Sequence, residues 1–150
     1  MPVDMNDVRA ALERDEPDYR QAQQLGSEAL PHLAALVRGD DPMLAAKAVY
    51  LASLLGHEAV KVVADAASHP DPTVRVAAAA ATRHLPAPAV TDIVIGLTAD
   101  ADSGVARVAL KSVPEHPSVE LRGQLQDLQR TSKNPDVREL ATRILTDSDA

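Results

Sequence analysis

Residues 71–78 read Asp71-Pro72-Thr73-Val74-Arg75-Val76-Ala77-Ala78. An Asp followed by a Pro favours a helix start, because the Asp side chain can accept a hydrogen bond from an unpaired backbone amide. Proline loses no hydrogen bond at the first helical position. Apolar residues then recur at the helical period, at Val74, Ala78, Ala81 and Leu85. The stretch therefore predicts a helix with one apolar face.

Similar openings elsewhere in the chain define a repeat. They begin at Asp41, Asp71, Asp102 and Asn134, which are 30, 31 and 32 residues apart, and Glu16-Pro17-Asp18-Tyr19 is a divergent fifth copy. We expect the four Asp and Asn residues to be helix N-caps. A repeat of this length is typical of solenoids, in which each unit buries its apolar face against its neighbours. Apolar residues two positions after each proline position should face this core, namely Tyr19, Leu44, Val74, Val105 and Val137.

Each repeat divides into two helices at a short break, which is the feature expected of a helical hairpin. The breaks are Gly26-Ser27, Gly56-His57, Leu85-Pro86 and His116-Pro117. A second apolar series follows each break. We therefore predict ten helices in a single domain over residues 1–150. They form a leading helix at 4–14, hairpins at 16–38, 41–68, 71–98 and 102–131, and a C-terminal capping helix at 134–146.

The core of such a domain must be built from small and aliphatic side chains. The chain has two tyrosines, no phenylalanine and no tryptophan, whereas 45% of its residues are hydrophobic. Alanine lets helices approach closely, but each buried alanine contributes little, at about 25 cal/mol per Å² of apolar surface removed from water. Many short contacts between neighbouring helices should therefore take the place of one large core.

The repeat resembles the HEAT-repeat family, specifically the short bacterial type called PBS-lyase HEAT-like repeats. The shared motif is Asp-Pro-x-Val-Arg-x-x-Ala, which stands at residues 71–78 and, with Leu140 before Ala141, at residues 134–141. The resemblance covers nearly the whole chain. It implies an all-α, right-handed α-solenoid of about five HEAT-like helical hairpins, an alpha-alpha superhelix of the armadillo type. The motif's Arg position holds Arg20, Arg75 and Arg138 but also Ala45 and Ala106, so we expect no unbroken Asp and Arg ladder.

The charge argues against several classes of partner. The formal net charge is −7 and the pI is about 5.1, whereas nucleic acids and anionic membrane surfaces require clustered Lys and Arg. No apolar window is long enough to span a membrane, and Asp4 and Asp7 stand where a signal peptide would be basic and then apolar. We therefore expect a cytoplasmic protein. Without cysteine, the chain has no disulfide, thiolate nucleophile or Cys-ligated zinc.

Several stretches partly match catalytic or metal-binding motifs, but each lacks a residue or a spacing that the motif requires. His57-Glu58-Ala59-Val60-Lys61 has a lysine where a zinc protease has its second histidine. Residues 100–104 begin like a calcium loop, but Gly104 and Lys111 stand where oxygen ligands belong. His57, His84 and His116 fall in successive repeats, about 10 Å apart, which is too far for one metal ion. We expect no catalytic residue, no cofactor and no metal.

The resemblance to HEAT-repeat proteins also suggests two enzymatic functions, but the residues of this chain do not support either of them. The name of the repeat type points to bilin-attachment lyases, which implies chromophore handling by resemblance alone. Some HEAT-fold proteins are DNA glycosylases, but an acidic chain without tryptophan fits the basic and aromatic surface of that class poorly.

The function expected of a stacked-hairpin solenoid is recognition, because repetition gives an extended face whose exposed positions vary independently of the core. We predict a non-catalytic interaction module or scaffold that binds another protein or a peptide on a concave face lined by the second helices. An alternative is a HEAT-like enzyme or lyase-related accessory subunit, which needs a cleft where Asp65 and Asp92 converge. A third is a structural subunit that caps a larger complex. The outward positions predicted for the partner are Pro31, Ala35, Lys61, Asp65, Thr91, Ile95, Arg122 and Gln126.

The helix at 134–146 should cap the solenoid. Its apolar residues Val137, Ala141, Ile144 and Leu145 are expected to pack inward, and polar residues lie between them. A polar outer face is what a terminal repeat needs to remain unpaired. We therefore predict a monomer.

Overall fold

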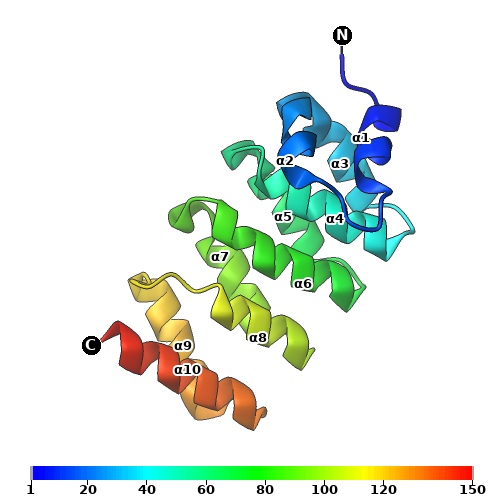
Figure 1. Cartoon of the computed structure of the whole chain (residues 1–150). Coiled ribbons are helices and arrows are strands. Elements are labelled where there is room, and N and C mark those ends of the chain that lie inside the picture. Colours follow the sequence, from blue (N-terminus) through cyan, green and yellow to red (C-terminus); the bar gives the residue numbers. More distant parts are fainter. Residues whose placement is uncertain (1, 150) are drawn as a thin grey trace.

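The computed structural model describes residues 2–149, and their secondary structure consists of ten α-helices and four short 3-10 helices (Figure 1). The leading helix and the first hairpin are α1 (Met5–Leu12), α2 (Tyr19–Ala22) and α3 (Leu30–Val37), with η1 (Gln23–Leu25) and η2 (Ser27–Ala29) between the last two. The next hairpins are α4 (Pro42–Ser53), η3 (His57–Ala59) and α5 (Val60–Ala67), then α6 (Pro72–Ala81), η4 (Thr82–His84) and α7 (Ala87–Thr98). The chain continues through α8 (Ser103–Lys111), α9 (Val119–Thr131) and α10 (Pro135–Ser148). The predicted all-α fold and its ten helices are confirmed.

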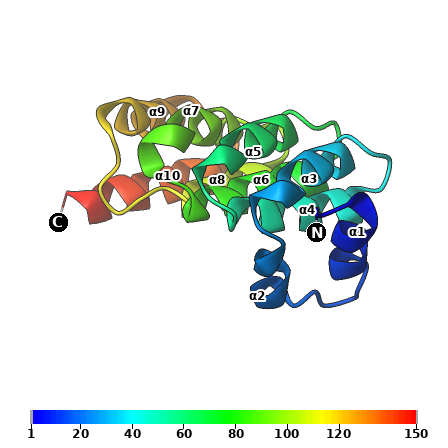
Figure 2. The same ribbon diagram turned by 90° about the horizontal axis from the view of Figure 1, so that it is seen from above.

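The helices form two layers that follow the order of the sequence. Figure 2 shows α3, α5, α7 and α9 side by side in one layer, which we call the second-helix layer. The first helices α4, α6, α8 and α10 form the other layer, and the short α2 stands off from it. Each hairpin packs on the next along the chain (Figure 1), as expected of a solenoid.

The predicted N-caps are confirmed at all four positions. Asp41 Oδ1 accepts from the amides of Met43 and Leu44, both at 3.1 Å, and Asp71 Oδ1 accepts from Thr73 at 2.8 Å. Asp102 and Asn134 cap α8 and α10 in the same way.

The divergent copy at Glu16 begins later than its motif suggests. Its cap is Asp18, whose Oδ1 accepts from the amide of Gln21 at 3.1 Å, and α2 starts at Tyr19. Aspartate, unlike glutamate, has the short side chain that N-cap positions favour.

Replacing Asp71 with Ala should lower the free energy of unfolding by about 1 kcal/mol, because the amide of Thr73 loses its side-chain acceptor. Urea denaturation followed by circular dichroism measures this loss. Asp71→Ser, which keeps an acceptor at the cap, is the control and should remain within about 0.5 kcal/mol of the parent. Equal stability of Asp71→Ala and the parent would contradict the capping role.

The turns within the repeats differ in length. Gly26 (φ 71°) and Gly56 (φ 109°) take up backbone conformations that favour glycine, and each leads directly into a 3-10 helix. Leu85 and Pro86 alone separate η4 from α7. In the repeat at 102–131, by contrast, the connection from the C-cap Ser112 to α9 runs through residues 113–118.

The core follows the predicted stripes and is rich in alanine where first helices meet. Ala48 on α4 and Ala78 on α6 are fully buried, and these two helices pack closely. A second apolar cluster lies under α10, and Ile144 packs against its edge. Its buried members are Ala106, Leu110, Leu125, Leu128, Val137, Ala141 and Leu145. The predicted inward face of α10 is therefore confirmed.

Replacing Ala78 with Leu should overpack the contact between α4 and α6 and cost about 1 to 3 kcal/mol of unfolding free energy. Thermal and urea unfolding measure this cost. Ala89→Leu is the matched control, because Ala89 lies on α7 and is exposed. If both variants unfold at the same temperature as the parent, Ala78 does not lie at a tight contact.

Arginine at the motif position holds the loops between repeats. Arg75 Nε donates to Asp100 Oδ2 at 2.8 Å, and its Nη1 donates to the carbonyls of His69 and Pro70, both at 2.9 Å. The hydrogen bond to Asp100 is the main reason that the pKa of Arg75 is raised. Arg138 repeats part of this pattern, donating to the carbonyl of Ser132 at 2.7 Å. Ala45 and Ala106 occupy the same position in the other repeats and have no such group, so the ladder is interrupted as expected.

Candidate functional site

A groove of about 780 Å³ lies between the third and fourth hairpins. It is lined by residues from η4 and the first half of α7, and by the end of α8, the 113–118 connection and the first turn of α9. Its apolar lining consists mainly of Leu85, Val90, Val94, Val113 and Leu121, with Pro88 and Pro114. This volume is within the range of about 300 to 1,000 Å³ that is common for ligand sites.

The length of the 113–118 connection accounts for the groove. In the third hairpin only two residues separate η4 from α7, and these two helices pack against each other. Pro114 and Pro117 lie in the longer connection, and proline has no backbone N–H with which to extend a helix. The chain therefore forms a loop between α8 and α9 (Figure 1). The loop ends at Ser118, the N-cap of α9, whose Oγ accepts a hydrogen bond from the amide of Leu121.

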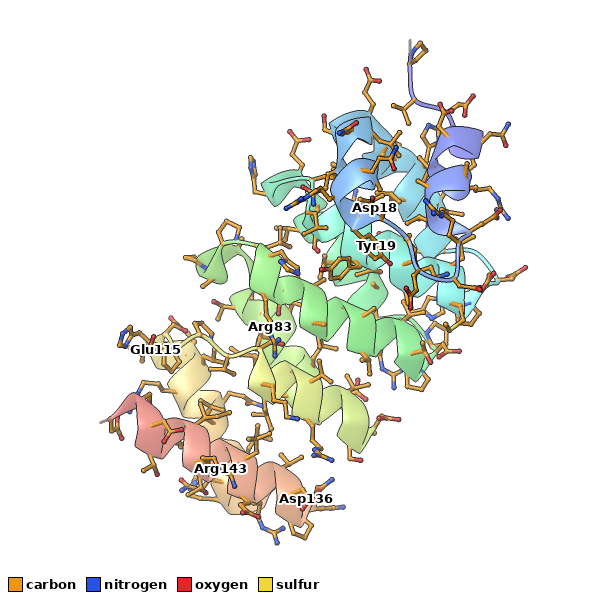
Figure 3. All side chains as sticks on the ribbon, viewed as in Figure 1. Asp18, Tyr19, Arg83, Glu115, Asp136 and Arg143 are labelled. Carbon is orange, nitrogen blue, oxygen red and sulfur yellow. The ribbon has the colours of Figure 1, made fainter. Side chains whose placement is uncertain are left out.

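Charged side chains of both signs surround the apolar lining. Arg83 follows α6, and its Nη2 donates to the carbonyl of Lys111, the last residue of α8, at 2.9 Å. Figure 3 shows Arg83 between the end of α6 and this connection, with Glu115 at the outer end of the connection. Asp92 on α7 and Glu120 on α9 contribute acidic groups from the second-helix layer. Among the charged residues that line the groove, which do not include Glu115, the cations thus lie at the ends of α6 and α8 and the anions on the second-helix layer.

Three of the four hydroxyl groups that line the groove donate to backbone carbonyls three or four residues earlier, the fourth being that of Ser118. Thr82 donates to the carbonyl of Ala79 at 2.7 Å, and Thr91 donates to that of Ala87 at 3.0 Å. Ser112 likewise donates to the carbonyl of Val108 at 2.8 Å. None of these three hydroxyls donates to a side chain that could act as a general base, which is the arrangement that a serine or threonine nucleophile requires.

Asp65 and Asp92 do not meet in this groove. Asp92 lines it, whereas Asp65 lies on α5 and pairs with Arg38 after α3, with a distance of 3.6 Å between Oδ2 and Nη1. The cleft that the enzymatic alternative requires from these two carboxylates is therefore not formed.

The eight residues predicted to contact a partner all lie on the second-helix layer. Five of them are exposed, namely Pro31, Ala35, Lys61, Asp65 and Gln126. Thr91 is half-buried and is the member of the set that lines the groove.

Ile95 and Arg122 are half-buried and engaged within the chain, contrary to the expectation that both are free on the outer face. Ile95 packs against the main core. Arg122 donates through Nη1 to Ser148 Oγ at 2.9 Å and through Nη2 to Asp149 Oδ1. The C-terminus of α10 places these polar groups beside α9, where they attract the guanidinium.

Sequence reasoning missed Arg83, Lys111 and the 113–118 connection. The longer connection could have been suspected from the repeat spacing, which increases to 32 residues between Asp102 and Asn134. That spacing alone does not say in which turn the extra residues fall.

A cluster of aromatic rings was also not anticipated. The Tyr19 and Tyr50 rings lie edge to face, with centroids 4.5 Å apart, and the Tyr50 and His84 centroids are 5.3 Å apart. Burial, and to a smaller extent Tyr50, raises the pKa of the Tyr19 phenol. These contacts fasten the four-residue helix α2 to α4, so we attribute a structural role to the cluster.

Nowhere in residues 2–149 do three His, Asp or Glu side chains gather closely enough to hold a metal ion. In the same range, no helix is both long enough and apolar enough to cross a membrane.

The stacked hairpins define a helical-repeat protein of the α-solenoid class. A family model described as HEAT repeats matches residues 29–114, which is more than half of the chain. The chain therefore belongs to the HEAT-repeat family, as the Asp-Pro-x-Val-Arg-x-x-Ala motif predicted.

Among solved structures, the chain is similar to a chain in the complex of CpcE and CpcF of phycocyanin lyase from Nostoc sp. PCC7120. The TM-score is 0.70 at 19% sequence identity, and the match covers 94% of this chain and 97% of the other. At this identity the likeness concerns the fold. No curated protein matches the chain by sequence.

Proposed function

We propose that this chain is a non-catalytic interaction module that binds a segment of a partner protein or peptide on its second-helix layer, with the groove between α7 and α9 as the main contact. The observation that carries this proposal is the composition of the groove, which has an apolar lining and a rim charged with both signs. Protein interfaces have the same anatomy, with an apolar centre inside a polar rim.

The similar solved structure supports a protein partner. That chain belongs to a complex of two proteins, CpcE and CpcF, so a solenoid of this architecture can work as part of a protein assembly. The groove of about 780 Å³ is too small for a folded domain, so a partner would insert one short segment into it.

A lyase-related accessory subunit is the second candidate. It is favoured by the fold shared with a phycocyanin lyase chain and by a groove whose volume is in the range of small-molecule sites. The engaged hydroxyls and the separation of Asp65 from Asp92 weigh against chemistry by these groups. A bound small molecule would be a further ligand of the same groove.

Site-specific photocrosslinking in cells of the source organism tests the proposal. A photoreactive amino acid at Thr91 should give one distinct crosslinked partner, because Thr91 lines the groove. Thr142 on α10 is the matched control, since it is exposed and its hydroxyl also donates to the carbonyl four residues earlier. The same partner captured equally from both positions, or no partner captured from Thr91, would contradict binding at the second-helix layer.

A further inference from the structure

We propose that the groove between α7 and α9 binds an extended peptide segment with an apolar centre, an acidic residue at the Arg83 and Lys111 rim, and a basic residue at the Asp92 and Glu120 rim. This inference rests on the proposed function and specifies the chemistry of the segment that the module recognises.

The apolar centre of the peptide is inferred from the side chains that the groove presents to a ligand. The hydroxyls of Thr82, Thr91 and Ser112 already donate to backbone carbonyls. Apart from the charged rim, the other hydrogen-bonding side chains of the lining are therefore His116 and Ser118, at the connection. Most of the rest of the lining is aliphatic, and its more accessible members are the exposed Ala87 and Pro88 and the half-buried Val113 and Pro114. Removing this surface from water gives about 25 cal/mol per Å², so aliphatic or proline side chains of a ligand gain most by entering.

The acidic end follows from the fixed cation at the rim. The hydrogen bond from Arg83 Nη2 to the backbone carbonyl of Lys111 holds the guanidinium at the C-terminal end of α8. A guanidinium has five N–H donors, so one such bond leaves donors for a carboxylate. Arg83 and Lys111 both line the groove, although the chain as a whole carries a net charge of −7. They should attract an acidic group.

The basic end follows from the opposite layer. Asp92 on α7 and Glu120 in the first turn of α9 are exposed and line the groove from the second-helix layer, whereas Arg83 and Lys111 line it from the ends of α6 and α8. A ligand with one charge sign would meet repulsion at one of the two rims. A segment with opposite charges flanking its apolar centre complements both rims, and this pattern fixes its direction in the groove.

Selection from a phage-displayed library of random peptides on the intact chain tests the inference. Peptides with apolar centres flanked by an acidic and a basic residue should be enriched, and their affinity should be measured with fluorescein-labelled synthetic copies. Arg83→Glu and Lys111→Glu should each weaken binding by about tenfold or more, because each places a like charge beside the acidic residue. Exchanging the peptide's acidic residue for lysine should recover binding to Lys111→Glu.

Two matched controls isolate the groove. Lys133→Glu makes the same charge change at an exposed residue between α9 and α10, outside the groove, and should leave the affinity within about twofold. Ala87→Trp should abolish binding by filling the groove, whereas Ala89→Trp, at an exposed α7 residue outside the lining, should not. Circular dichroism of each variant establishes that the helices are intact.

Several outcomes would overturn the inference. Enriched peptides without a charge pattern would contradict the assigned chemistry. Affinities that are lowered by Lys133→Glu and unchanged by Lys111→Glu would place the peptide elsewhere. If this occurs while Thr91 still crosslinks to a partner, the proposed function stands and the assigned peptide chemistry is wrong. If Thr91 gives no crosslinked partner but the peptides respond to the groove variants as expected, peptide recognition stands and the cellular role is wrong.

Discussion

A chain that ends at residue 133, and so lacks α10, is expected to lose roughly 5 kcal/mol of unfolding free energy and to become prone to aggregation. Val137, Ala141 and Leu145 are the buried residues of α10, and they shield Leu110 on α8 and Leu125 on α9 from water. Fully burying one valine or leucine contributes about 1.5 to 3 kcal/mol, so removing the helix affects both sides of the contact. Urea unfolding and analytical ultracentrifugation of the shortened chain measure the two effects.

A point variant keeps this prediction testable if the shortened chain does not fold. Leu145→Ala should cost about 2 to 5 kcal/mol, as for other large-to-small substitutions in a core. Thr146→Ala, on the exposed side of the same helix, is the control. A shortened chain as stable as the parent would show that α10 does not cap the second cluster.

The same experiment addresses the predicted monomer. Ile144 is half-buried at the edge of the second cluster, so Ile144→Asp should weaken the packing of α10 within one chain. Sedimentation of the parent should show a monomer at all concentrations tested. A tight dimer that Ile144→Asp dissociates would instead identify α10 as an interface between chains.

Replacing Arg75 with Ala is expected to cost about 2 to 4 kcal/mol of unfolding free energy. The guanidinium donates to Asp100 and to two carbonyls, and the two side chains are only 19% and 11% exposed. Removing one partner of a largely buried ion pair leaves the other charge desolvated and without its partner. The loss should exceed that of a surface pair because water does not replace these bonds.

Arg143→Ala is the matched control for Arg75→Ala. Arg143 pairs with Glu139 at 3.4 Å, and both side chains are well exposed (65% and 71%), so its loss should cost less than about 1 kcal/mol. Urea unfolding of both variants gives the comparison. Equal costs for the two substitutions would show that Arg75 does not hold the loops between repeats.

Local chemistry explains which parts of the fold could be predicted from the sequence. The pairing of Asp with Pro marks a helix start through nearby atoms, so Asp41, Asp71 and the other caps were identified correctly. The apolar stripe of α10 was identified because helical periodicity depends on spacing alone. The late start of α2 was missed, since Glu16 and Asp18 are alternatives that only the folded chain decides between.

The groove depends on contacts that spacing does not encode. The prediction placed Arg122 on the outer face because its position in the helical period faces away from the core, but its guanidinium is bound by Ser148 and Asp149 at the neighbouring C-terminus of α10. Likewise, the hydrogen bond from Arg83 to Lys111 joins residues 28 positions apart, in two different repeats. The second-helix layer could therefore be predicted as a surface, whereas its groove required the folded chain.

Nuclear magnetic resonance titration of the intact, ¹⁵N-labelled chain with a selected peptide tests binding at the groove most directly. Recognition there predicts amide shift changes concentrated in residues 82–94 and 111–121, with no comparable changes in α3 or α10. Shift changes confined to α3 and α5, or spread along the first helices, would contradict the groove as the recognition site.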